Sequence, residues 1–211
     1  MRTGATVAAL LLALCTTAAS GLWAKAAWSQ SVSASEILTV LRAGGYVIVV
    51  RHGATYADQA DTDPFNLDNV AKQRQLNDKG RADARALGEV FKASGVPIGQ
   101  AYSSRFARAV ETARLIAGKE PTATLDITEG GLVVSPNENN RRAQALRAMA
   151  GKAPDAGTNT LVVTHKPNIL DAFGRDWFEV REGEASIFKP ASDGKFSLVG
   201  RVAIDQWATS K

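Results

Sequence analysis

The chain has 211 residues, of which 45% are hydrophobic and 22% are charged, with a formal net charge of +4. This is enough apolar material for one ordinary core, and a chain of this length is expected to form one domain or at most two. The mixed, modest charge is not that of a disordered protein, and a single Cys excludes a disulfide framework. Because no basic run is interleaved with aromatic residues, no nucleic-acid partner is expected.

The N-terminus has the pattern of a secretory signal peptide. Met1-Arg2 is a short basic region, and Ala5–Leu14 is an apolar stretch followed by small residues. Ala24-Lys25-Ala26 fits a cleavage site, with Ala18-Ala19-Ser20 as a second candidate. An uncleaved membrane anchor is the alternative, but the apolar stretch is short for a membrane span.

Cleavage after Ala26 would leave a single domain over residues 27–211, with residues 1–26 as the signal peptide. It would remove Arg2 and Lys25, two of the 25 basic residues, so that 23 would face 21 acidic ones. Cys15 would be lost as well, leaving a mature chain without cysteine. We therefore expect a periplasmic or secreted protein without stable membrane insertion, without a disulfide and without a cytosolic cofactor.

Helical and strand patterns alternate along the rest of the chain. Ser33-x-x-Glu36 is a capping box that opens a helix, and Gly44-Gly45 ends that helix. Tyr46–Val50 is a β-branched run typical of a strand buried on both faces, and residues 54–76 form a long polar loop. Further helices are predicted after Asn77 or Asp78, after Ser104 as a cap, from Asn137 and at Pro167, and further strands at Ala101–Ser103, Asn159–Thr164, Ala185–Lys189 and Phe196–Ile204. This order predicts a three-layer α/β/α sandwich with a mostly parallel central sheet.

The sequence contains two histidines, His52 and His165. His52 follows the Tyr46–Val50 strand after Arg51, and His165 directly follows the strand that ends at Thr164. A third strand end, Ser103-Ser104, leads into a helix that carries Arg108. Because ligands bind at the carboxyl ends of parallel strands, we expect these groups and Arg51 to converge. Guanidinium groups match phosphate oxygens two at a time, and an imidazole kept neutral by nearby positive charge can be a nucleophile. The pattern therefore predicts a site for phosphoryl transfer.

Three segments in this order resemble the histidine phosphatase superfamily, which has the phosphoglycerate mutase-like fold. They are Arg51-His52-Gly53, Ser103-Ser104-x3-Arg108-Ala109-x2-Thr112-Ala113 and Val163-Thr164-His165. Leu76-Asn77-Asp78-Lys79-Gly80-Arg81 is similar to a further segment common in that family. The resemblance extends from about Gly45 to the C-terminus, and the small exported bacterial phosphatases are its most similar branch.

The resemblance implies a role for each matching residue. His52 would be the nucleophile that becomes phosphohistidine, and Arg51 and Arg108 would bind the phosphoryl oxygens around it. His165 would complete this phosphate-binding set and stabilise charge in the transition state. No metal and no other cofactor is implied. The general acid is best matched by Glu129, and the alternatives are Glu182, Glu184 and Asp58.

We accordingly expect an exported, metal-independent phosphatase that hydrolyses phosphomonoesters, either a small phosphorylated substrate or an envelope phosphate. Ala54–Asp58 depart from the segment that follows Arg-His-Gly in the family, which disfavours mutase activity. One alternative is a non-catalytic phosphate- or anion-binding protein on the same fold. Another is a metallohydrolase that uses both histidines and a carboxylate. The sequence carries no readable signal for the physiological substrate or for the oligomeric state.

Overall fold

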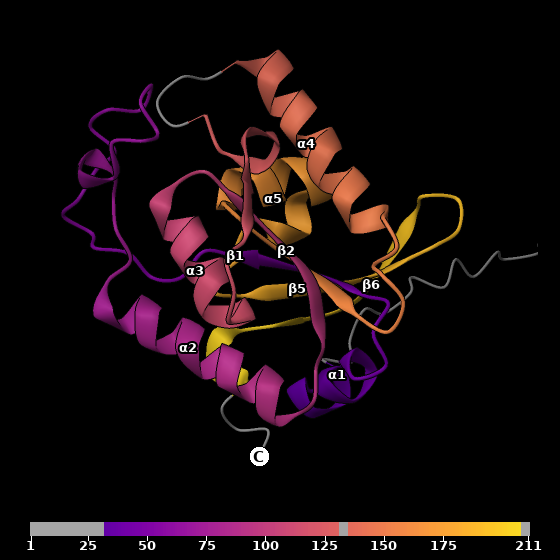
Figure 1. Ribbon diagram of the computed structural model, residues 1–211. Coiled ribbons are helices and arrows are strands. Elements are labelled where there is room, and N and C mark those ends of the chain that lie inside the picture. Colours follow the sequence, from indigo (N-terminus) through magenta and orange to yellow (C-terminus); the bar gives the residue numbers. More distant parts are fainter. Residues whose placement is uncertain (1–31, 131–134, 208–211) are drawn as a thin grey trace, which may run out of the picture. The chain divides into compact units, whose positions relative to one another are not determined.

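The computed structural model describes residues 32–130 and 135–207, so the predicted signal peptide lies outside the described residues. Its helices are α1 (Ala34–Leu41), α2 (Asp78–Ala93), α3 (Ala107–Ala117), α4 (Pro136–Gly151) and α5 (Lys166–Phe173) (Figure 1). Its strands are β1 (Val47–Arg51), β2 (Ile98–Ser104), β3 (Thr122–Thr124), β4 (Asn159–Thr164), β5 (Ala185–Pro190) and β6 (Phe196–Val202). None of the helices in these described ranges is both long and apolar enough to cross a lipid bilayer.

The strands form one six-stranded sheet in the order β3-β2-β4-β1-β5-β6. β3, β2, β4 and β1 pair in parallel, whereas β5 and β6 form an antiparallel hairpin at the β1 side. Helices cover both faces of this sheet: α1, α2 and α3 pack on one face and α4 and α5 on the other (Figure 1). The predicted three-layer α/β/α sandwich with a mostly parallel sheet is confirmed.

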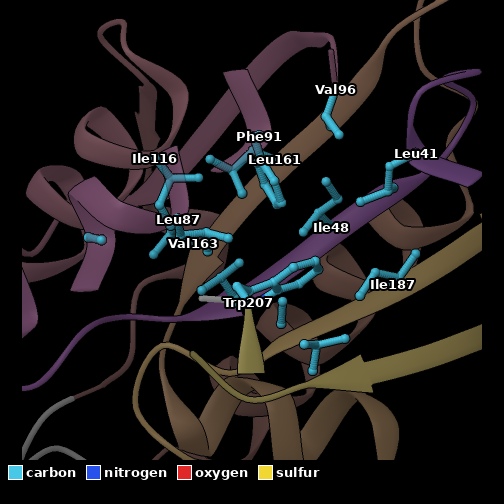
Figure 2. Packing of buried hydrophobic residues seen from close by; sticks show 14 of the residues in the cluster. Leu41, Ile48, Leu87, Phe91, Val96, Ile116, Leu161, Val163, Ile187 and Trp207 are labelled. Atoms are coloured by element: carbon cyan, nitrogen blue, oxygen red, sulfur yellow. The ribbon is translucent and has the colours of Figure 1, made fainter. Parts of the chain in front are cut away.

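The two faces of the sheet follow from the alternation of side chains along β1. Ile48 and Val50 pack with α1, α2 and α3, whereas Val47 and Val49 pack with α4 and α5. All four side chains have no exposed surface, as expected for a strand covered on both sides. Figure 2 shows the hydrophobic core on the α1, α2 and α3 side of the sheet, which includes the buried Trp207. The Trp207 and Phe91 rings pack edge to face, with their centroids 5.4 Å apart.

The predicted starts of helices α1 and α2 are confirmed. Ser33 and Glu36 form the predicted capping box of α1, and the Asn77 side chain caps α2 by accepting from the backbone N–H of Gly80. Ser104, however, is wrong as a cap: α3 begins at Ala107, and Ser104 is the last residue of β2. The Ser104 hydroxyl instead contacts His165, which makes it part of the candidate site. The three-residue strand β3 was not predicted, because Thr122–Thr124 is short and partly exposed.

Candidate active site

Three neighbouring parallel strands end at the same edge of the sheet and supply the site. Arg51 at the end of β1 pairs with Thr164 at the end of β4, and Ser103 of β2 pairs with Val163 of β4. The backbone N–H of His52 donates to the Thr164 carbonyl at 2.9 Å, which extends the ladder by one step. As expected from the topology, His52 and His165 are therefore adjacent, with ring centroids 5.1 Å apart.

His52 is buried, with only 3% of its surface exposed, and its ring has a defined orientation. Its Nδ1 lies 2.8 Å from the carbonyl oxygen of Gly53. Because a carbonyl oxygen can only accept, Nδ1 carries the proton and Nε2 keeps its lone pair. Burial lowers the pKa of His52 well below its usual value, and the adjoining His165 and Arg108 lower it further. The result is a neutral imidazole with a nucleophilic Nε2 near neutral pH.

Close backbone packing holds the segment after His52 in place. The backbone N–H of Gly53 donates to the Thr112 hydroxyl of α3 at 3.1 Å. On the other side, a Cβ on Gly80 of α2 would lie 2.1 Å from the carbonyl oxygen of Ala54. Only glycine permits this approach of the helix to the loop, so the Leu-x-x-x-Gly segment contributes to the site by contact rather than by chemistry.

Arg108 of α3 is fully buried and lies between two carboxylates. Its Nη1 is 3.0 Å from Asp61, and its Nη2 donates to Glu129. Its guanidinium also lies over the Phe106 ring, 4.2 Å from the centroid. This packing fixes the plane of the guanidinium, which is the condition for two-point recognition of a phosphoryl group.

His165 adjoins both His52 and Glu129. Its Nε2 is hydrogen-bonded to the Ser104 hydroxyl at 2.7 Å, and its Nδ1 is 3.1 Å from Glu129 Oε1. Burial lowers the pKa of His165 well below its usual value, and the positive charge of Arg108 lowers it further. Glu129 thus touches both His165 and Arg108, so the structure brings it together with the predicted phosphate-binding residues.

The other predicted acids are engaged elsewhere or stand apart. Glu182 pairs with Arg51 at 3.5 Å, and Arg51 also donates to the Val180 carbonyl at 2.9 Å. Glu184 is buried and held by Arg201, whose Nε donates to it at 2.7 Å. Asp58 lies exposed on the 54–76 loop. Of the four candidates for the general acid, Glu129 is therefore the one that contacts both His165 and Arg108.

Two residues of the site were missed by the sequence analysis, Asp61 and Arg74. Asp61 Oδ1 accepts both from Arg108 and from the backbone N–H of Arg74, at 3.0 and 2.9 Å. After burial and Arg108, the positive charge of Arg74 lowers the pKa of His165. Both residues belong to the irregular 54–76 loop, whose sequence shows no periodic pattern from which their positions follow.

Two of the predicted phosphate-binding residues carry a buried guanidinium nitrogen without a hydrogen-bond partner among the described residues: Arg51 Nε and Arg108 Nε. Buried donors of this kind are costly unless a ligand supplies acceptors, and an oxyanion supplies several. Within residues 32–130 and 135–207, no three His, Cys, Asp or Glu side chains group as metal ligands. Both histidines instead face Arg108, whose charge favours an anion.

The depressed pKa values of His52 and His165 predict a pH-dependent stability. Below about pH 6.5 the unfolded chain protonates both histidines, whereas the folded chain keeps them neutral. The unfolded state then binds more protons, so the free energy of unfolding should fall with falling pH, by up to about 2.7 kcal/mol per pH unit. Urea unfolding at about pH 5.5 and pH 7.5 measures this slope. His52→Gln should reduce the slope by about half, and an unchanged slope would contradict the assignment.

Part of the chain matches a known protein family. Residues 47–132 match the family model of the histidine phosphatase superfamily (branch 1). No protein with a curated function matches the chain significantly.

Solved structures share its fold. The protein histidine phosphatase SixA complexed with tungstate is 18% identical, with a TM-score of 0.56 over 76% of this chain and 97% of SixA. YhfR from Bacillus stearothermophilus is 18% identical, with a TM-score of 0.53 over 75% of this chain and 98% of that chain. A phosphoserine phosphatase mutant from Entamoeba histolytica, in complex with phosphoserine, is 17% identical, with a TM-score of 0.50 over 76% of this chain and 98% of that chain. Over residues 47–132 the chain thus matches the histidine phosphatase superfamily, and over about three quarters of its length it shares the fold of these solved structures.

Proposed function

We propose that the protein is a metal-independent phosphatase that hydrolyses phosphomonoesters through a phosphohistidine on His52. The observation that carries the proposal is the hydrogen bond from His52 Nδ1 to the Gly53 carbonyl, which leaves Nε2 as the nucleophile. Its neighbours are His165, at 5.1 Å between ring centroids, and Arg108, whose charge contributes to the lowered pKa of His52. A neutral nucleophile beside a fixed cation suits attack on a phosphoryl group.

In the first step, His52 Nε2 attacks phosphorus and a P–N bond forms. The bond between phosphorus and the leaving oxygen breaks, and Glu129 acts as the general acid that delivers a proton to that oxygen. Arg51, Arg108 and His165 hold the phosphoryl oxygens as charge develops on them. We assign this task to Glu129 because it contacts both Arg108 and His165.

In the second step, a water molecule attacks phosphorus and the P–N bond breaks. The proton of the water passes to Glu129 and replaces the one delivered in the first step, while His52 Nε2 regains its lone pair. Orthophosphate leaves, and the site returns to its starting state.

The compounds bound in related folds support a small phosphorylated substrate. One SixA structure holds tungstate, a tetrahedral oxyanion, and the phosphoserine phosphatase holds phosphoserine. The N-terminal pattern further supports our proposal that the protein acts outside the cytoplasm, in a periplasm or after secretion. N-terminal sequencing of the protein recovered from the extracytoplasmic fraction tests this; a start at residue 27 is expected, and an intact Met1 would overturn it.

A trapping experiment tests the mechanism. The purified protein is incubated with a phosphomonoester labelled in its phosphoryl group, in the presence of EDTA, and quenched in alkali. We expect an acid-labile, alkali-stable phosphate on the peptide that contains His52. The same preparation should release phosphate from 4-nitrophenyl phosphate at an undiminished rate in EDTA.

The two alternatives predict different results. A metallohydrolase would lose turnover in EDTA and regain it with a divalent ion, without a phosphohistidine. A non-catalytic anion-binding protein would bind phosphate or tungstate and turn over none of a broad panel of phosphomonoesters. Either result would overturn the proposal.

A further inference from the structure

A pocket of about 300 Å³ lies beside the candidate site. Its lining comes from the 54–76 loop, from the segment that follows β3 and from the first turns of α4, and it includes Thr128 and Glu129. Glu129 therefore faces this pocket and at the same time contacts Arg108 and His165. If Glu129 gives its proton to the leaving oxygen, the rest of the leaving group extends into the pocket that Glu129 lines.

One part of this pocket is apolar. Phe65 and Leu125 line it from two different segments and are 85% and 52% exposed. Leu67 adds a third apolar side chain to the lining. Large apolar side chains so exposed to water gain free energy when a ligand covers them. The pocket is therefore suited to a leaving group with an apolar body, and its volume is within the range of small-molecule sites.

The other part of the pocket is charged: Arg142 of α4 lines it, together with the carboxylates of Glu129 and Glu138. The Arg142 side chain is only 18% exposed, yet its polar contacts are weak: Nη1 is 3.4 Å from Asn139, and Nη2 is 3.9 Å from Glu138. Its buried Nε has no hydrogen-bond partner among the described residues. A guanidinium with unused donors in a pocket favours an anionic ligand group such as a carboxylate or phosphate.

The neighbouring Arg141 shows the contrast on the same helix. Its Nη1 is 2.6 Å from Asp126, its Nε is 3.1 Å from Glu138, and its side chain is 44% exposed. Arg141 does not line the pocket. The two adjacent arginines thus differ in their hydrogen bonding: Arg141 is paired with carboxylates at the surface, whereas Arg142 has an unpaired donor beside the pocket.

We propose that this pocket binds the leaving group of the substrate and that Arg142 binds a second anionic group on it. The substrate class is a phosphomonoester whose leaving group has an apolar body that ends in a carboxylate or a second phosphate. The inference rests on the proposed phosphatase function and specifies its substrate class. Arg142 acts as a specificity residue, since it is separated from the reacting atoms by the pocket.

Paired substrates test this proposal without interference from leaving-group reactivity. N-acetyl-O-phosphotyrosine and its carboxamide share one phenol and differ in a single carboxylate, and 4-carboxymethylphenyl phosphate and its carboxamide form a second, shorter pair. The wild-type protein should prefer the acid over the amide by about tenfold or more in kcat/KM in at least one pair, as one charge-assisted contact gives. Arg142→Gln should bring this ratio to about one.

Arg141→Gln is the matched control and should keep the wild-type ratio, because Arg141 lies outside the pocket. Arg142→Lys should retain part of the preference for the acid over the amide, because lysine keeps the positive charge but lacks the two parallel donors of the planar guanidinium. The ratio is measured within each variant, so partial unfolding of a variant does not change it. Equal hydrolysis of acid and amide by the wild-type protein would overturn the subsite and leave the phosphatase proposal standing. Failure to hydrolyse any of these esters, with no phosphohistidine formed, would overturn both.

Discussion

His52→Ala is expected to abolish phosphatase turnover, with a loss of at least about a thousandfold in kcat. The variant lacks the Nε2 lone pair that the hydrogen bond to Gly53 leaves free in the native protein. Arg51, Arg108 and His165 remain, so binding of tungstate or phosphate should persist although no covalent intermediate forms. Steady-state release of 4-nitrophenol, together with calorimetric titration of tungstate, measures the two properties separately.

A control addresses folding of this variant. His52 is buried and stays neutral in the folded protein, so its replacement removes no charge from the core. The variant should therefore still unfold cooperatively, at a temperature lowered only by the cavity that the imidazole leaves. Imidazole added to His52→Gly should restore part of the turnover, because it can occupy the vacated space as a nucleophile. Full activity in His52→Ala would refute the covalent mechanism.

Arg108→Gln is expected to reduce kcat by about 100- to 1000-fold, the usual cost of removing one fixed donor from developing negative charge. Arg108 is fully buried between Asp61 and Glu129, so the substitution also leaves two carboxylates without their shared cation. We expect the free energy of unfolding to fall by about 3–5 kcal/mol as a result. Kinetics with 4-nitrophenyl phosphate and urea unfolding measure the two effects.

Arg105→Gln is the matched control for Arg108→Gln. Arg105 belongs to the same segment, but its side chain is 37% exposed and pairs with the exposed Asp68 at 2.6 Å. Exposed ion pairs contribute little, so this variant should change stability by less than about 1 kcal/mol. Arg108→Lys separates charge from geometry: it should recover stability better than kcat, because lysine lacks the planar fork. Equal effects in the Arg105 and Arg108 variants would contradict the assigned role of Arg108.

Much of the site could be predicted from the sequence, because it is built where regular elements end. His52 and His165 each follow a run of β-branched residues, and the carboxyl ends of parallel strands share one edge. Arg108 follows from the helix after the third strand. Each of these inferences needs only the period of a strand or a helix and the parallel arrangement of the sheet.

The remaining parts depend on contacts that no local pattern encodes. Asp61 reaches Arg108 from an irregular loop, and its position depends on hydrogen bonds such as the one from the backbone N–H of Arg74. Ser104 was predicted as a helix cap because serine before a helix usually is one, yet its hydroxyl binds His165 from the end of β2. The pocket beside Glu129 forms only where the loop, the segment after β3 and α4 meet.

The pairing of β1 with β4 joins opposite halves of the chain, and the ladder continues by one step to His52, the proposed nucleophile. A partly folded chain that lacks this pairing does not hold His52 and His165 next to each other. Contacts so distant in sequence form slowly, since loop closure costs entropy before the pairing repays it. During refolding, enzymatic activity should therefore return together with the last cooperative transition of the chain, which makes turnover a direct probe of complete folding.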